Sequence, residues 1–454
     1  MNTCKILMPI GSMGAGFNPE TFAAGMALGP DVIAVDAGST DSGPGYLANG
    51  MCKYTRAMLK SDLSIAVLAA KKAGIPFFVG SCGTCGTDNM VDLCAELVEE
   101  IYKENGLTGK IAKIYSQQTA DIIKKKWDEG KIRALDGAPG VCRETFDECT
   151  NIVALLGAEP FIKAWQNGAD VVLGGRATDT ANIAAMAVYK GCNTAAAWHG
   201  AKTVECGAQC TDTSEDKGVF LTVDEEGFTV TPLGEKTRCT PYTISAHLLY
   251  ETSDPTRLTE PSGSFLTKDA VYTQLPDGRS VRVIGSTFEP AAKYTMKLEG
   301  AGIVGYQNIS LVGITNRKVL ADPETWIKNI SAYVDKFIRK VGIDPGDYSF
   351  NFKAYGYNAV IEGPVPVGTP PPREIGMLLT VTAKTQELAT QIAKIFNPYL
   401  LHFPADLNED LPSFAFPFSP VDIPRGATCE FKLLHVVECD DPFELVRFEY
   451  VEIE

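Results

Sequence analysis

Four loops rich in Gly, Ser, Thr and Asp follow short apolar segments in the first half of the chain, at residues 11–16, 36–45, 80–89 and 174–179. Glycine lets the backbone approach a ligand, hydroxyl groups donate hydrogen bonds, and helix amino ends favour negative charge. One such loop is common in any α/β protein, but four in equivalent positions predict a site for a small anion. The ligand-binding candidates are Gly14, Gly38, Ser39, Thr40, Ser81, Gly83, Thr84, Gly175 and Arg176.

Arg176 is the candidate with the most specific chemistry, because it follows two glycines at the end of an apolar segment. A guanidinium group binds a carboxylate through two parallel hydrogen bonds, so Arg176 is expected to clamp the carboxylate of a substrate. The alternative is a structural salt bridge to Asp179 or Asp41.

Three acidic residues are candidates for proton transfer: Asp36, Asp179 and Glu205. Carboxyl groups serve as general acids or bases when they lie within reach of the reacting group. Asp36, Asp41 and Asp179 could instead hold a divalent cation, and each alone is equally consistent with a helix cap. Beyond that cation, the sequence predicts no cofactor.

Cys82 and Cys85 are the third kind of candidate, since they come just before an expected helix that Thr87 or Asp88 would cap. A helix amino end lowers the pKa of a thiol, which would make a thiolate available as a base or nucleophile. The alternative is that both thiols fill space in a crowded glycine loop. The 13 cysteines and 4 histidines are not spaced like a structural zinc site.

Several classes of function are disfavoured. The glycines at 11, 14 and 16 do not form the dinucleotide-binding pattern, and the loop lacks the lysine of a P-loop. A net charge of -15 argues against nucleic acid or an anionic membrane as a partner. No run approaches the ~18 apolar residues that span a bilayer. Because no secretion signal is evident, we expect the cysteines to be reduced thiols, and we expect a soluble, cytoplasmic protein.

The elements that must position these residues are strands alternating with helices. We expect strands at 5–10, 32–35, 76–79, 111–115 and 170–173, with helices at 19–28 and 54–73, around 90–102, from 120, and at 179–189. Strands separated by such helices predict an α/β fold with a large, parallel, doubly wound sheet. Ligands of such sheets bind beyond the carboxyl ends of the strands, where the four loops would meet.

The pattern changes in the second half. A hairpin is expected from 220–223 and 228–231, in a stretch (200–300) that is an insertion or the edge of the first domain. From 306 the order becomes strand, helix, strand, strand, helix, strand, which predicts a ferredoxin-like α+β domain. Asp322 and Pro323 should start its first helix, and 429–437 and 443–450 should supply the closing strands. The expected domains are therefore 1–300 and 306–454.

An ordered set of motifs resembles the acyclic terpene utilisation (AtuA-like) family, formerly a domain of unknown function. The motifs are Gly-Gly-Arg-Ala-Thr-Asp (174–179), Glu-Cys-Gly-Ala-Gln (205–209), His-Leu-Leu-Tyr-Glu (247–251) with Asp254-Pro255, Leu-Glu-Gly (298–300) through Gly-Tyr-Gln-Asn-Ile-Ser (305–310), and Phe-Pro-Ala-Asp (403–406) through Pro424-Arg425. The resemblance covers nearly the whole chain. It implies an α/β domain followed by a ferredoxin-like one, and catabolism of terpenoid or other carboxylic acids or their CoA thioesters, often beside a small companion protein. Residues 80–86 depart from the family in carrying cysteines, so the resemblance implies no thiol mechanism.

Together these features predict an enzyme that transfers a proton next to a carbonyl of a small carboxylate or acyl-CoA, as a hydro-lyase. An isomerase or racemase would use the same groups without loss of water. The alternatives are a noncatalytic ligand-binding subunit of a complex, or hydrolysis through Cys82, for which no histidine partner is evident. We also expect a homo-oligomer.

Overall fold

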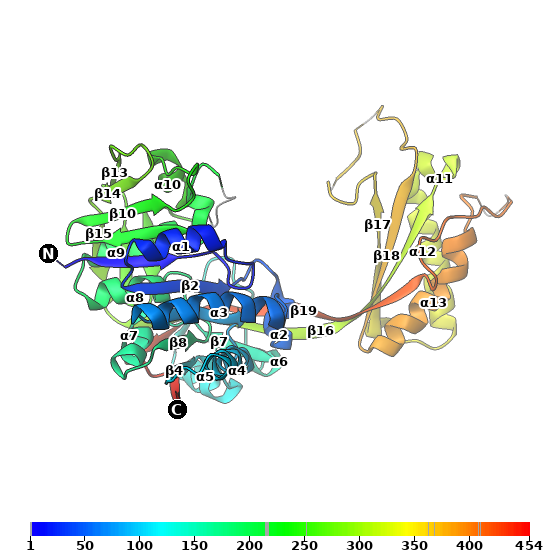
Figure 1. The fold of residues 1–454 in the computed structure, drawn as a ribbon. Helices are drawn as coiled ribbons and strands as arrows, with labels where there is room; N and C mark the ends of the chain where they lie inside the picture. The colour runs from blue at the N-terminus through cyan, green and yellow to red at the C-terminus, as the bar shows by residue number, and fades with distance from the viewer. Residues whose placement is uncertain are drawn as a thin grey trace. The chain divides into compact units, whose positions relative to one another are not determined.

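The computed structural model describes residues 2–213, 218–250, 252–361, 363–366, 368–406, 408 and 410–454. The chain forms two compact units, Met1–Gly302 with Phe431–Glu454, and Ile303–Glu430 (Figure 1). It leaves the first unit within β16 (Tyr294–Ile314) and returns within β19 (Asp422–Cys439). The units therefore differ from the expected domains 1–300 and 306–454 at the carboxyl end, because residues 431–454 belong to the first unit.

The first unit contains a ten-stranded sheet in the order β13-β14-β10-β9-β1-β2-β3-β8-β4-β20. Its central strands run parallel, as the sequence predicts. They are β1 (Cys4–Met8), β2 (Val32–Gly38), β3 (Phe77–Thr84), β8 (Val171–Gly174) and β4 (Gly109–Tyr115). The connecting helices include α1 (Pro19–Ala27), α3 (Arg56–Ala73), α4 (Asp88–Glu104), α5 (Ala120–Asp128), α7 (Ala158–Gln166) and α8 (Ala181–Tyr189).

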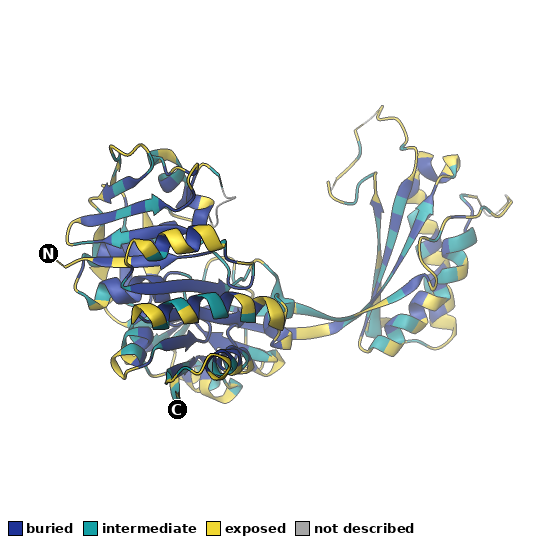
Figure 2. Ribbon diagram, viewed as in Figure 1, coloured by how far each residue is buried: buried dark blue, intermediate teal, exposed yellow. Residues whose placement is uncertain are grey.

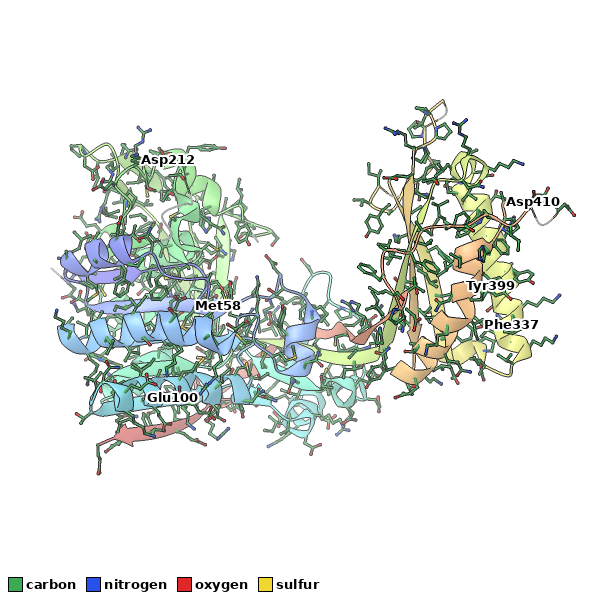
Figure 3. The ribbon with its side chains drawn as sticks, turned by 45° about the vertical axis from the view of Figure 1, so that its right-hand side comes forward. Met58, Glu100, Asp212, Phe337, Tyr399 and Asp410 are labelled. Carbon is green, nitrogen blue, oxygen red and sulfur yellow. The ribbon has the colours of Figure 1, made fainter. Side chains whose placement is uncertain are left out.

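Both faces of this sheet are covered. Along β1, Ile6 packs into a core that includes Phe161 of α7 and Ile183 of α8, whereas the next residue, Leu7, packs into a second core with side chains of α1, α3 and α4. This alternation follows from the two-residue period of a strand. The outer sides of α3 and α4 carry the exposed Met58 and the partly exposed Glu100 (Figures 2 and 3).

The sheet is mixed, which corrects the prediction of a parallel one. The predicted hairpin is confirmed as β9 (Val219–Val223) and β10 (Gly227–Pro232), which extend the sheet antiparallel to β1 together with β14 (Val281–Ile284) and β13 (Val271–Gln274). At the other end β20 (Arg447–Ile453) pairs antiparallel with β4. The prediction that 443–450 closes the second domain is wrong, because residues 447–450 belong to β20 and pair with the backbone groups of the β4 edge.

The second unit contains α11 (Arg317–Ala321), α12 (Pro323–Lys340), β17 (Tyr348–Tyr355), β18 (Ile375–Ala383) and α13 (Gln386–His402), with parts of β16 and β19. The predicted start of α12 is confirmed, since Asp322 Oδ1 accepts a hydrogen bond from the backbone N–H of Thr325 at 3.0 Å. Trp326 of α12 packs into the core of this unit, while Phe337 of the same helix is exposed (Figure 3).

No helix within the described ranges is long and apolar enough to cross a membrane.

Candidate functional site

A cleft of about 1050 Å³ lies in the first unit where the loops after β1, β2 and β8 meet. The end of α9 (Thr194–Val204) and the strand β11 (Arg257–Glu260) form its other side. Two walls of the cleft are in close contact at Gly11. A Cβ atom added at Gly11 would lie only 2.4 Å from a backbone atom of Cys206. The cleft is therefore at the carboxyl ends of parallel strands, where the four glycine loops predict a site.

Half of the sequence-derived candidates line this cleft. They are Asp36, Gly38, Ser39, Thr40, Arg176, Asp179 and Glu205, and Asp41 lines it as well. Those that do not line it are Gly14, Ser81, Cys82, Gly83, Thr84, Cys85 and Gly175.

Two of the candidates outside the cleft, Ser81 and Thr84, hold neighbouring loops together. Ser81 adopts a left-handed backbone with φ of 52°, and its Oγ accepts hydrogen bonds from Arg176 Nη1 and from the Ala177 N–H, both at 3.1 Å. Thr84, with φ of 76°, accepts a hydrogen bond from the Lys53 N–H at 3.0 Å. Such strained residues persist only where surrounding contacts fix them. They therefore act on the site through their neighbours.

The two thiols are buried, and burial raises the pKa of both Cys82 and Cys85. The neighbouring Cys94 thiol raises the pKa of Cys82 further. The prediction of a lowered thiol pKa is wrong. The reason is that β3 continues to Thr84, which places Cys82 in the core between the sheet and its helices and not at the amino end of α4.

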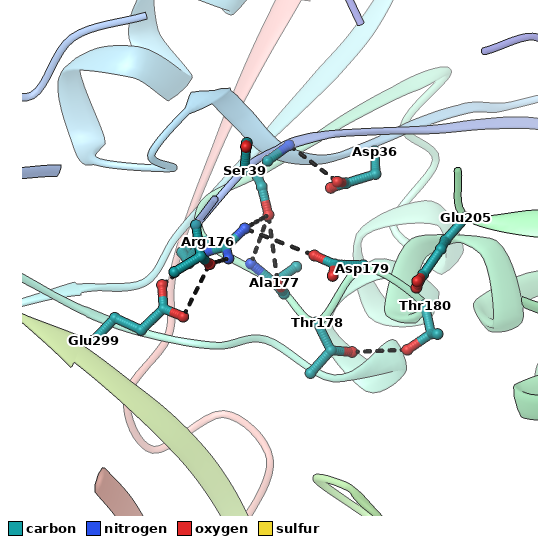
Figure 4. Close-up of polar contacts among 12 residues, drawn as sticks. Asp36, Ser39, Arg176, Ala177, Thr178, Asp179, Thr180, Glu205 and Glu299 are labelled. Atoms are coloured by element: carbon teal, nitrogen blue, oxygen red, sulfur yellow. Dashed lines mark hydrogen bonds and ion pairs between the residues drawn. The ribbon is translucent and has the colours of Figure 1, made fainter. Parts of the chain in front are cut away.

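Arg176 belongs to a network of protein groups (Figure 4). Its Nε donates to Glu299 Oε2 at 3.0 Å, Nη1 to Ser81 at 3.1 Å and Nη2 to the Thr40 hydroxyl at 2.6 Å. Asp179, one of the salt-bridge partners expected from sequence, is 3.8 Å away. The main partner is Glu299, which also accepts from Lys297 Nζ at 2.9 Å. The arginine is thus held by the protein itself.

Asp36 is the candidate that is most clearly poised for proton transfer. Its Oδ2 accepts from the Gly38 N–H at 3.1 Å, while Oδ1 is buried without a hydrogen-bond partner in the described part of the chain. Burial, reinforced by the negative charge of Asp179, raises the pKa of Asp36 to about 8, although Arg176 acts in the opposite direction. The carboxyl is therefore largely protonated at neutral pH.

Glu260 is a second buried carboxyl in the wall of the cleft, and sequence reasoning missed it. Its two oxygens accept hydrogen bonds from the hydroxyls of Thr178 at 2.8 Å and Thr180 at 2.6 Å. Burial raises its pKa to about 7, against the lowering effect of these hydrogen bonds. No signal near Glu260 in the sequence indicates burial, because the residues that enclose it lie about 80 positions earlier in the chain.

Glu205 is also buried, and it forms an ion pair with Lys202 one helical turn earlier. Burial, followed by the charge of Asp179, raises the pKa of Glu205 well above its usual range. Cys206 and His247 lie beside it, with one potential ligand atom from each of the three residues within 4.8 Å of the others. Among the residues that the structure describes, the predicted cation ligands Asp36, Asp41 and Asp179 do not form such a group. Glu251, from the same motif as His247, lies outside the described residues.

Lys53 supplies a positive charge to the cleft from a loop that sequence reasoning passed over. Its Nζ lies 5.8 Å from the centroid of the Tyr54 ring, and both residues line the cleft. Within the described ranges Lys53 makes no ion pair, in contrast to Arg176, Lys202 and Lys297. It is therefore a cation that can accept an anionic ligand without first breaking a salt bridge.

A family model described as acyclic terpene utilisation family protein AtuA matches residues 49–415 of the chain. Neither a curated protein nor a solved structure matches the chain significantly. The match spans most of the chain, including the loops at 80–89 and 174–179 and the residues Glu205, Glu260 and Glu299. The chain belongs to the AtuA family.

Proposed function

We propose that the protein is an enzyme that transfers a proton next to the carbonyl of a small carboxylate or acyl-CoA, as a hydro-lyase. One observation carries the proposal: Asp36 and Glu260, two buried carboxyl groups with pKa values of about 8 and about 7, line the same cleft. At neutral pH such a pair provides a protonated acid beside a group that is ready to act as a base.

In the dehydration direction, the Glu260 carboxylate takes the proton from the carbon next to the carbonyl. The Asp36 carboxyl gives its proton to the leaving hydroxyl as the carbon–oxygen bond breaks, and water departs. The hydroxyl groups of Ser39 and Ser42 in the cleft wall share one hydrogen bond and keep one proton to donate, so they are suited to stabilising the enolate that forms. Afterwards Glu260 loses its proton to water and Asp36 regains one, so no oxidant or reductant is needed.

Exchange in deuterated water tests this proposal. The purified protein is incubated with a panel of small hydroxy acids, unsaturated acids and their CoA thioesters, and products are analysed by NMR and mass spectrometry. We expect deuterium at the carbon next to the carbonyl, together with loss or gain of water. Deuterium exchange without loss or gain of water by the substrate would identify an isomerase or racemase. Binding of a panel member without exchange would favour a noncatalytic subunit.

The substrate anion is expected to bind to Lys53. Lys53→Met should weaken substrate binding by about 10-fold, the loss expected for a charge-assisted hydrogen bond of roughly 1.5 kcal/mol, with little change in kcat once substrate is saturating. Lys72→Met, at an exposed position near the end of α3, is the matched control and should bind like the wild type. Equal affinity in both variants would exclude Lys53 as the anion-binding group.

We also infer that the second unit is ferredoxin-like. What supports this is its order of strand, helices, strand, strand, helix, strand, with the strands paired in the order β17-β18-β16-β19. A cytoplasmic location, a small companion subunit and a homo-oligomeric state stay predictions.

A further inference from the structure

Glu205, Cys206 and His247 bring an oxygen, a sulfur and a nitrogen donor together. The first two residues follow directly on α9, and His247 ends α10 (Pro241–His247). One ligand atom from each lies within 4.8 Å of the others. Three donors of different chemistry, contributed by two separate segments, therefore lie close enough together to share one metal ion.

Two of these residues have buried polar atoms that the protein leaves unsatisfied. Glu205 Oε2 and His247 Nε2 have no hydrogen-bond partner among the described residues, although the side chains are only 3% and 7% exposed. Leaving a buried polar atom without a hydrogen-bond partner is energetically costly. Two such atoms in the same cluster therefore indicate a ligand that would satisfy both.

The neighbours of the cluster are compatible with a cation. Lys202, the adjacent positive group, contacts the other carboxylate oxygen of Glu205, Oε1, which leaves Oε2 available. The Tyr250 ring stacks on the His247 imidazole with centroids 5.8 Å apart, which fixes the ring orientation. Glu205, Cys206 and Tyr250 all line the cleft, so an ion bound here would be reachable from it.

We propose that Glu205, Cys206 and His247 bind a zinc ion at the wall of the cleft. Thiolate and imidazole ligands suit Zn²⁺, whereas Mg²⁺ and Ca²⁺ require oxygen ligands. Three protein ligands leave one position of a tetrahedral zinc ion for water or substrate. The site goes beyond the proposed function, since proton transfer by Asp36 and Glu260 does not require it.

Metal binding can be measured without substrate, so its failure is distinguishable from failure of the proposed function. Full-length protein freed of metal with a chelator is titrated with Zn²⁺ by calorimetry and with Co²⁺ by absorption spectroscopy. We expect one Zn²⁺ per chain and a thiolate-to-cobalt charge-transfer band. His247→Gln and Cys206→Ser should each weaken Zn²⁺ binding at least as much as the roughly 10–100-fold lost when a supporting residue of a metal site is removed. Cys206→Ser should also abolish the charge-transfer band.

His402→Gln and Cys142→Ser are the matched controls, because each removes one histidine or cysteine outside the cleft. Both should bind Zn²⁺ and Co²⁺ like the wild type. Circular dichroism of the metal-free variants reports whether each one folds. If His247→Gln fails to fold, the wild-type cobalt spectrum and Cys206→Ser still decide the question. The proposal is overturned if the wild type binds no stoichiometric Zn²⁺, or if folded His247→Gln and Cys206→Ser bind it unchanged.

Discussion

Replacing Asp36 with asparagine is expected to reduce turnover by about 10²–10⁴-fold, the contribution typical of one general acid. Asparagine has nearly the shape of a protonated aspartic acid and preserves the acceptor that bonds the Gly38 N–H. Its amide protons are not acidic enough to be transferred to a leaving hydroxyl. The loss should therefore appear in kcat, with substrate affinity nearly unchanged. The substrate is the one identified by deuterium exchange, and steady-state kinetics measures both parameters.

The same substitution should change how stability depends on pH. In the unfolded chain Asp36 loses its proton near its ordinary pKa of 3.8, whereas in the folded protein its pKa is about 8. Between these values the folded state holds a proton that the unfolded state has lost, so this group makes the free energy of unfolding fall as pH rises. The slope is at most about 1.4 kcal/mol per pH unit. Asp36→Asn removes this contribution and should be more stable than the wild type at pH 8.

Urea unfolding at pH 5 and pH 8 measures this difference. Asp121→Asn makes the same chemical change at an exposed position in α5, away from the cleft, and should match the wild type in turnover and in pH dependence. Full turnover by Asp36→Asn would move the role of general acid to another group. An unchanged pH dependence would show that Asp36 is ionised in the folded protein at neutral pH.

The sequence predicts the central parallel strands and the edge where their loops meet, because both follow from local patterns. Apolar runs such as 32–35 and 111–115 can only be buried strands when helices separate them, and right-handed crossovers place every strand-end loop on one side. That is why Asp36 and Arg176, 140 positions apart, line the same cleft. The helix start at Asp322 is equally local, since a capping side chain bonds its own helix.

The features that sequence reasoning missed depend on contacts between distant segments. Glu299 lies in β16 and meets Arg176 across 123 positions, so nothing beside either residue indicates the pair. Glu260 is buried by threonines of another loop. The apolar segment 76–79 predicts a strand that ends at residue 79, and therefore a Cys82 thiol at the start of the next helix. The strand β3 instead runs to Thr84. The edge of β4 is likewise paired by a strand more than 300 positions later.

Breaking the Arg176–Glu299 pair is expected to destabilise the first unit strongly. Both side chains are almost fully buried, at 5% and 3% exposure. Arg176→Ala leaves the Glu299 carboxylate buried, with the partly exposed Lys297 as its remaining ion-pair partner among the described residues. Breaking a buried pair in this way destabilises by about 3–5 kcal/mol. The matched control is Arg143→Ala, which breaks the exposed pair with Asp128, about half exposed on each side. Pairs of that kind contribute only about 0–1 kcal/mol.

The pH dependence identifies the mechanism of this loss. Interactions with Arg176 and then with Lys297 outweigh burial and lower the pKa of Glu299 to about 2 from its ordinary 4.5. This group therefore contributes stability that is fully present above pH 4.5 and is lost as pH falls toward 2. Arg176→Ala forfeits that contribution, so its deficit relative to the wild type should be largest near pH 7 and should shrink on acidification. Urea unfolding at pH 7 and pH 4 measures both deficits.

The double substitution Arg176→Met with Glu299→Leu, which leaves neither charge of the pair buried, should recover part of the loss. A variant Arg176→Ala that keeps its stability but no longer binds substrate would instead identify Arg176 as a clamp for the substrate carboxylate.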